Sequence, residues 1–80
     1  MKERIKQIIV NDDIVYLFTE EPEKDIEILK KAYEKRDEEE YEFPLGYEIP
    51  ELSEYEFLGT KNKCISLWFD NEDIPEFFTN

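Results

Sequence analysis

Acidic side chains are the most numerous reactive groups in this sequence, with 22 Asp and Glu among 80 residues and no His. Paired carboxylates hydrolyse glycosidic bonds when they flank a cleft and one of them has a raised pKa. In so acidic a chain, however, neighbouring carboxylates arise without any catalytic role. The lack of His also removes the usual general base at neutral pH. The carboxylates alone therefore do not indicate an active site.

The cysteine and glycine content also argues against catalysis. The single cysteine, Cys64, has no imidazole partner to activate it, and it lies in an apolar run typical of a buried strand. The two glycines, Gly46 and Gly59, are too few to build a phosphate-binding loop. We therefore predict that the chain is not an enzyme and takes no cofactor.

A short run of oxygen-bearing side chains, Asp70 to Asp73, has the ligand types of a calcium loop. It lacks the alternate spacing, the central glycine and the distant glutamate of an EF-hand. Asp73 and Glu76 instead have the spacing of a capping box, with Pro75 in the first turn. This pattern predicts a short helix within residues 71–80 rather than a metal site.

Negative charge is concentrated in the second half of the chain. Residues 1–36 carry nine acids and eight bases, whereas residues 37–80 carry thirteen acids and two bases. Such a field repels nucleic acid and anionic membranes and accelerates encounter with a basic protein. We therefore predict a basic protein partner, with no direct nucleic-acid or membrane binding. The candidate contact residues are Asp37, Glu38, Glu39, Glu40, Glu42, Glu48, Glu51, Glu54, Glu56, Asp70, Glu72 and Asp73.

The length and apolar content predict one folded domain, residues 1–80, of the α+β class. Forty per cent of the residues are hydrophobic, which favours a folded chain, although a core of this size is small. No apolar run resembles a signal peptide or a membrane span, and one cysteine forms no internal disulfide. We expect a cytoplasmic protein.

Two apolar runs around Asn11, Asp12 and Asp13 predict a hairpin over residues 1–19. An even-numbered loop places Ile8 and Val10 on the same face as Val15 and Leu17. The opposite face then carries other apolar side chains: Ile9, Ile14, Tyr16 and Phe18. Such a hairpin is either covered on both faces or presents one face to another chain, including a second copy in a homodimer.

Residues 20–36 predict an amphipathic helix. Pro22 suits the first turn, acids precede bases along the segment, and Ile26, Leu29 and Tyr33 form an apolar stripe. We expect this stripe to pack on the sheet. Residues 37–53 are predicted to be irregular and acidic, with a short edge strand around residues 40–43.

Residues 54–70 predict a second hairpin. A three-residue loop, Lys61 to Lys63, would place Tyr55 opposite Phe69 and Phe57 opposite Leu67 on a shared apolar face. Glu54 would then face Asp70, and Glu56 would face Trp68. A short helix, capped by Ser53 and Glu56 and ended by Gly59, is the alternative.

The expected architecture is thus a small antiparallel sheet of about four strands in two hairpins, with one main helix and a short C-terminal helix. The segments Tyr41-Glu42-Phe43 and Tyr55-Glu56-Phe57 repeat one pattern, in which aromatics build the core and glutamates face outward.

Charge and size favour an inhibitor that covers the basic nucleic-acid site of another protein. This is the strategy of DNA mimics such as phage or mobile-element anti-restriction and anti-CRISPR proteins. Alternate carboxylates on a strand lie about 6.7 Å apart, comparable with two phosphate steps of DNA. Glu40 with Glu42, and Glu54 with Glu56, have this spacing. The alternatives are an immunity protein or antitoxin against a cationic nuclease, and an acidic domain with an unrelated role.

Overall fold

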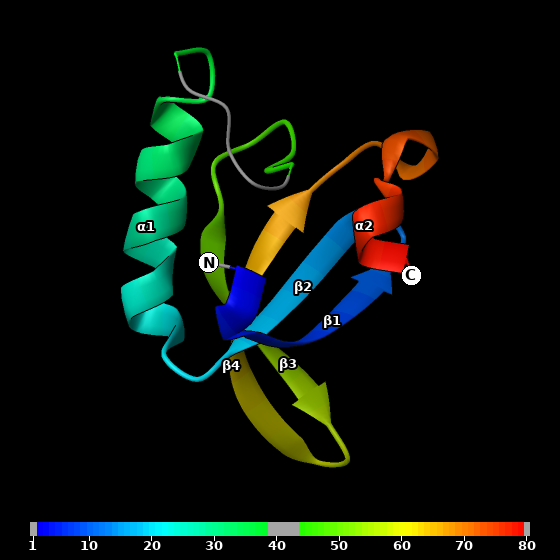
Figure 1. Ribbon diagram of the computed structural model, residues 1–80. Helices are drawn as coiled ribbons and strands as arrows, with labels where there is room; N and C mark the ends of the chain where they lie inside the picture. The colour runs from blue at the N-terminus through cyan, green and yellow to red at the C-terminus, as the bar shows by residue number, and fades with distance from the viewer. Residues whose placement is uncertain (1, 39–43, 80) are drawn as a thin grey trace.

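The computed structural model describes residues 2–38 and 44–79 and contains one four-stranded antiparallel sheet (Figure 1). The strand order is β1-β2-β4-β3, so that β1 and β3 are the edges. The strands are β1 (Ile5–Asn11), β2 (Ile14–Thr19), β3 (Glu51–Phe57) and β4 (Thr60–Trp68). The helical elements are η1 (Lys2–Arg4), α1 (Pro22–Glu34), η2 (Asn71–Asp73) and α2 (Glu76–Thr79). The predicted α+β architecture of two hairpins, one main helix and a short C-terminal helix is confirmed.

The first hairpin has the predicted register. Ile8 pairs with Leu17 and Val10 pairs with Val15, so their side chains share one face of the sheet. Asp12, in the two-residue turn, has a φ of 56°. Asp tolerates this left-handed conformation better than most residues because its short polar side chain bonds locally.

The second hairpin differs from the expected register. Its turn is Leu58-Gly59, and both residues have positive φ, 51° and 80°, as a type I′ turn requires. The predicted loop over Lys61 to Lys63 was wrong, because these residues lie inside β4. The helix capped by Ser53 was wrong as well, because that segment is β3, which begins at Glu51, within the segment expected to be irregular. Leucine rarely adopts positive φ, so Leu58 gave no turn signal.

The shifted register changes every cross-strand partner in this hairpin. Tyr55 pairs with Asn62 and Phe57 with Thr60, rather than with Phe69 and Leu67. Consequently, Phe57 remains 54% exposed and does not join the core. The first Tyr-Glu-Phe segment, residues 41–43, lies outside the described residues.

Helix α1 packs one apolar stripe on the sheet, as predicted. Pro22 occupies its first turn, and Ile26 and Leu29 are fully buried. The helix begins and ends two residues inside the expected span. Lys35 and the residues after it form a turn, in which the Glu38 amide donates to the Lys35 carbonyl at 2.9 Å.

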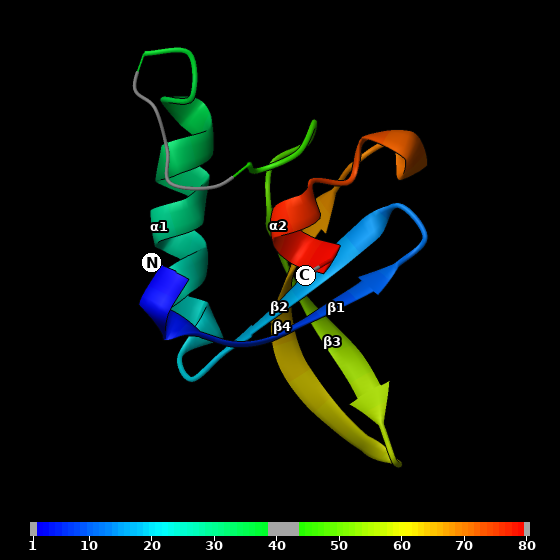
Figure 2. The same ribbon diagram turned by 45° about the vertical axis from the view of Figure 1, so that its right-hand side comes forward.

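The hydrophobic core lies on one side of the sheet, beneath α1, the segment 44–50 and α2 (Figures 1 and 2). Phe69 and Phe78 contact each other there, with ring centroids 5.4 Å apart. The buried apolar side chains in this cluster are Val15, Leu17, Ile26, Leu29, Leu45, Ile65, Leu67, Phe69 and Phe78. None of the described helices lies on the other side of the sheet.

The segment 44–50 is fixed against the end of β4. Gly46 has a φ of 89°, and a Cβ atom there would lie 2.1 Å from the carbonyl oxygen of Trp68. The same carbonyl accepts a hydrogen bond from the Tyr47 amide at 3.0 Å. The Tyr33 hydroxyl of α1 donates to the Tyr47 carbonyl at 3.0 Å. Only glycine allows this close approach of two backbone segments.

None of the helices in residues 2–38 and 44–79 combines the length and apolar character needed to cross a membrane.

Candidate acidic interface

Three separate segments bring carboxylates to one end of the sheet. The β1–β2 turn is joined to the end of β4 by a hydrogen bond from the Phe69 amide to the Asp13 carbonyl, at 2.9 Å. The segment 44–50 is joined to the same strand end through Tyr47 and Trp68. We call this region the acidic end. Its carboxylates are Asp12, Asp13, Glu48, Asp70, Glu72 and Asp73.

Tyr47 lies among these carboxylates, and its side chain is 53% exposed. The pKa of its hydroxyl is raised above the ordinary value, first by desolvation and then by the negative charges of Asp13, Glu48 and Asp70. The hydrogen bonds that join the three segments at the end of β4 place these carboxylates around Tyr47. The acidic end therefore combines a negative field with an exposed aromatic ring.

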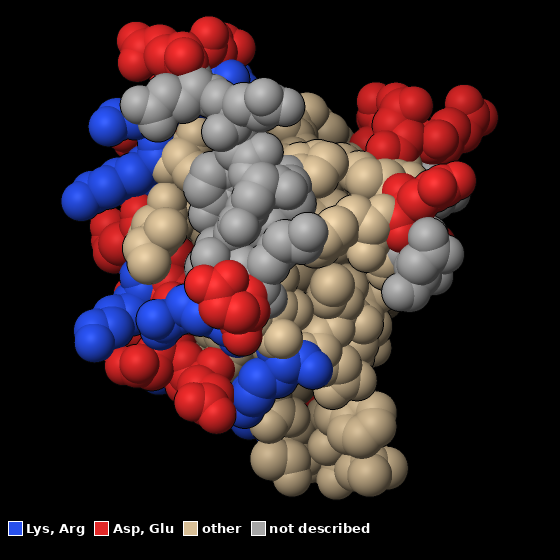
Figure 3. Space-filling model, in the orientation of Figure 1, with Lys and Arg blue, Asp and Glu red and all other residues tan. Residues whose placement is uncertain are grey.

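No basic residue balances these acids along the chain. The sequence contains no Lys or Arg in residues 7–23, 44–60 or 64–80, and these ranges supply the whole acidic end. Figure 3 shows acidic side chains projecting at the upper right, over the part of the molecule where η2 lies, with no basic side chain beside them on that face.

Glu54 and Glu56 lie elsewhere and have basic neighbours. Glu54 pairs across the sheet with Lys63, and Glu56 pairs with Lys61. Lys63 also forms an ion pair with Glu23 of α1 at 2.5 Å. This contact raises the pKa of Lys63 and lowers that of Glu23. The predicted phosphate-like spacing exists here, but the lysines partly neutralise it.

These side chains line a groove of about 560 Å³ between the start of α1 and the second hairpin. Its walls include Leu52, which is 45% exposed, beside three glutamates and two lysines. The groove is thus of mixed charge. It offers no concentrated negative field to a basic partner.

The remaining predicted contact residues do not join the acidic end. Asp37 and Glu38 follow α1, beside Arg36, whose guanidinium lies 3.9 Å from the centre of the Tyr33 ring. Glu51 lies on the side of the sheet away from the helices, where it pairs with Ser66. Glu39, Glu40 and Glu42 lie outside the described residues. Of the twelve predicted positions, the structure gathers four: Glu48, Asp70, Glu72 and Asp73.

Asp12, Asp13 and Tyr47 belong to the acidic end but were not among the predicted contact residues. The two aspartates lie in the half of the chain that is nearly neutral overall, and they were interpreted only as turn residues. Their membership depends on the β2–β4 pairing, which joins strands that are distant in sequence. The only sequence feature that could have placed Asp12 and Asp13 in an acidic surface was the lack of any Lys or Arg between Lys6 and Lys24.

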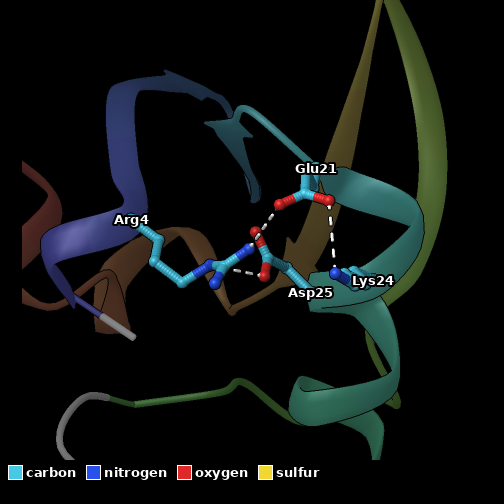
Figure 4. Close-up of polar contacts among 4 residues, drawn as sticks. All are labelled: Arg4, Glu21, Lys24 and Asp25. Atoms are coloured by element: carbon cyan, nitrogen blue, oxygen red, sulfur yellow. Dashed lines mark hydrogen bonds and ion pairs between the residues drawn. The ribbon is translucent and has the colours of Figure 1, made fainter.

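An ion pair between a half-exposed arginine and a buried aspartate lies apart from this surface, at the start of α1 (Figure 4). Asp25 is fully buried, and its Oδ1 lies 2.7 Å from Nε of Arg4. Arg4 also contacts Glu21 at 3.4 Å, and Glu21 pairs with Lys24 at 3.5 Å. Neither Asp25 oxygen receives a well-aligned hydrogen bond from the described residues. This cluster fastens η1 to α1.

Comparison of the chain with protein-family models, with curated proteins and with solved structures finds no match. Among the described residues, no group of three or more His, Cys, Asp or Glu side chains is arranged to hold a metal ion. Function is therefore inferred from the geometry and charge of the acidic end.

Proposed function

We propose that this chain is a small inhibitor that covers the basic nucleic-acid-binding surface of another protein, as DNA mimics do. The observation that supports this proposal is the acidic end, where three segments hold carboxylates around an exposed tyrosine and no Lys or Arg lies in the sequence ranges that supply them. A basic groove that accepts phosphates also accepts a cluster of carboxylates, because both present oxygen-borne negative charge to Lys and Arg.

The two components of the acidic end have different roles in this proposal. Unbalanced charge accelerates encounter with a positive surface over distances up to about a Debye length, roughly 8 Å at physiological salt. Tyrosine is enriched among the residues that dominate binding energy, because it buries a large ring at low entropic cost. Tyr47 is thus the proposed anchor, and the surrounding acids set the orientation.

Inhibition of DNA binding tests the proposal directly. The purified chain is added to a panel of restriction endonucleases, RNA-guided nucleases and nuclease toxins, and DNA cleavage is measured at several DNA and salt concentrations. We expect inhibition of at least one member, competitive with DNA and weaker at high salt. If a toxin alone is inhibited, the chain is an immunity protein rather than a defence inhibitor.

Two variants of equal charge localise the contact. Glu48, Asp70 and Glu72 are exposed, and Asp70 makes no capping hydrogen bond, so their replacement by Lys leaves the core untouched. Glu20, Glu27 and Glu34 are exposed in or beside α1, and their replacement by Lys changes the net charge equally. Inhibition should fall at least about tenfold in the first variant and about twofold in the second. Equal losses, or no inhibition of any panel member by the wild type, would refute the proposal.

A further inference from the structure

The side of the sheet opposite the helices is almost free of charge. We call this side the open face. Only one of its fifteen paired strand positions, Glu51, is charged, and the exposed Lys6 lies beside them at the β1 bulge, whereas 40% of the whole chain is charged. The fifteen positions are Gln7, Ile9, Asn11, Ile14, Tyr16, Phe18, Glu51, Ser53, Tyr55, Phe57, Thr60, Asn62, Cys64, Ser66 and Trp68. Exposed strand faces of a soluble acidic chain are expected to carry charge, so this depletion indicates a contact surface.

An aromatic ridge runs across the open face. Tyr16 of β2 and Tyr55 of β3 meet above β4, with ring centroids 4.9 Å apart. Phe18 adds an edge-to-face contact with Tyr55 at 5.9 Å. The strand between them contributes the small residues Cys64 and Ser66, both buried, which leaves room for the rings to meet. The ridge is therefore held in place before any partner arrives.

The second hairpin extends the open face beyond the body of the domain. Residues 65–68 of β4 pair with β2, whereas the rest of β4 pairs only with β3. The projecting part carries Phe57, 54% exposed, and Leu58, 91% exposed (Figure 1). A two-stranded hairpin is only marginally stable by itself in water. Contact on its apolar side would therefore support it.

The charge distribution selects the kind of partner for the open face. Nucleic acid and anionic membranes are repelled by a net charge of −12. A basic protein gains little from a face with one carboxylate. A second copy of the chain has the same net charge, but it presents the same nearly neutral aromatic surface, and the six carboxylates of the acidic end lie outside the strands, in turns, loops and η2. We propose that two copies pack open face against open face.

The area of the face sets the strength of this dimer. Four strands about 4.8 Å apart and about six residues long cover roughly 400 Å² per copy. Stable complexes bury about 800 Å² per partner, so we expect this association to be weaker than that of a standard protein–protein complex. A two-fold, isologous contact uses the same residues of both copies. The inference does not depend on the proposed function.

Sedimentation of the purified chain tests this proposal, over about 1 to about 500 µM at low and high salt. We expect a monomer–dimer equilibrium that shifts toward dimer as salt rises, because screening reduces repulsion between two acidic copies. Binding to a basic partner responds to salt in the opposite direction. The only tryptophan, Trp68, lies on the open face, so its emission should shift with concentration as a second measurement.

Two variants of equal net charge distinguish a contact through the open face from a general effect of net charge on dimerisation. Gln7→Glu with Asn62→Glu adds two acids at exposed positions of the open face, on different strands. Lys31→Gln with Lys35→Gln gives the same net charge by changing exposed residues at the end of α1. The first variant should weaken the dimer at least about tenfold and the second by about twofold or less, with thermal melts confirming that both are folded. A wild type that stays monomeric throughout, or equal effects of the two variants, would overturn the proposal.

Discussion

Nε of Arg4 lies 2.7 Å from Oδ1 of Asp25, a carboxylate that has no solvent exposure. The two residues belong to η1 and α1, so the contact joins the N-terminal turn to the main helix. Arg4 itself is 40% exposed. The ion pair therefore has one solvated partner and one buried partner. When the contact is broken, Arg4 can still be hydrated, whereas the charge of Asp25 is left without water or a counter-charge.

Removal of Arg4 should be strongly destabilising. In Arg4→Ala, the carboxylate of Asp25 remains buried without its counter-charge, and we expect the free energy of unfolding to fall by about 3 kcal/mol. Urea denaturation measures this loss. Adding Asp25→Asn to Arg4→Ala should recover part of the stability, because the buried group is then neutral. A double variant as unstable as Arg4→Ala would contradict this account.

The two glycines should respond differently to alanine. Both have positive φ, but a Cβ at Gly46 meets the Trp68 carbonyl at 2.1 Å, whereas Gly59 has no atom within 4 Å. Gly59→Ala should therefore cost about 1 kcal/mol from backbone strain alone. Gly46→Ala should cost at least about 2 kcal/mol more, because two backbone segments must separate. Similar melting temperatures for the two variants would be inconsistent with the close contact.

Leu58→Asn should stabilise the isolated chain. Leu58 has a φ of 51° and is 91% exposed, so it contributes strain without burial. Asn-Gly is the preferred pair for a type I′ turn. We expect a gain of about 1 kcal/mol in the free energy of unfolding, measured at low protein concentration to keep the chain monomeric. If the free energy of unfolding does not rise, the positive φ of Leu58 imposes no strain on the turn.

Stability should decline at alkaline pH through Cys64. Burial raises the pKa of this thiol, so the folded chain keeps the proton over a pH range in which the unfolded chain loses it. The stabilising contribution is complete below the unfolded pKa, about 8.5, and is lost as the pH rises toward the folded value. Urea titrations at about pH 7 and about pH 9.5 should show a larger drop for the wild type than for Cys64→Ala. Equal drops would exclude the thiol as the cause.

Local patterns were enough to predict the first hairpin and the main helix. Asp12 is a common turn residue, and the alternation of Ile8 and Val10 fixes the face that is buried. Pro22 and the stripe through Ile26 and Leu29 similarly define α1. In these elements, the conformation that each residue prefers locally is the one that the tertiary structure requires.

The second hairpin was predicted in the wrong register because its turn contains a residue that rarely adopts the required backbone conformation. Leu58 disfavours positive φ, whereas Lys61 to Lys63 resembled a loop, so the register was shifted and Phe57 was assigned to the core. The acidic end was predicted only in part. Asp13, Glu48 and Asp70 are distant in sequence, and only the pairing of β2 with β4 brings them around Tyr47.

That pairing also determines how the chain reaches its folded state. Each hairpin closes a two-residue turn, but β2 and β4 join residues as distant as Ile14 and Trp68. Closing so long a loop lowers the entropy of the chain before the contacts between β2 and β4 have formed to offset that loss. The two hairpins are thus suited to rapid, independent formation, and their docking along β2 and β4 becomes the slow, cooperative step. The acidic end forms only after that step, so the binding of a basic partner that we propose for it requires the completed fold.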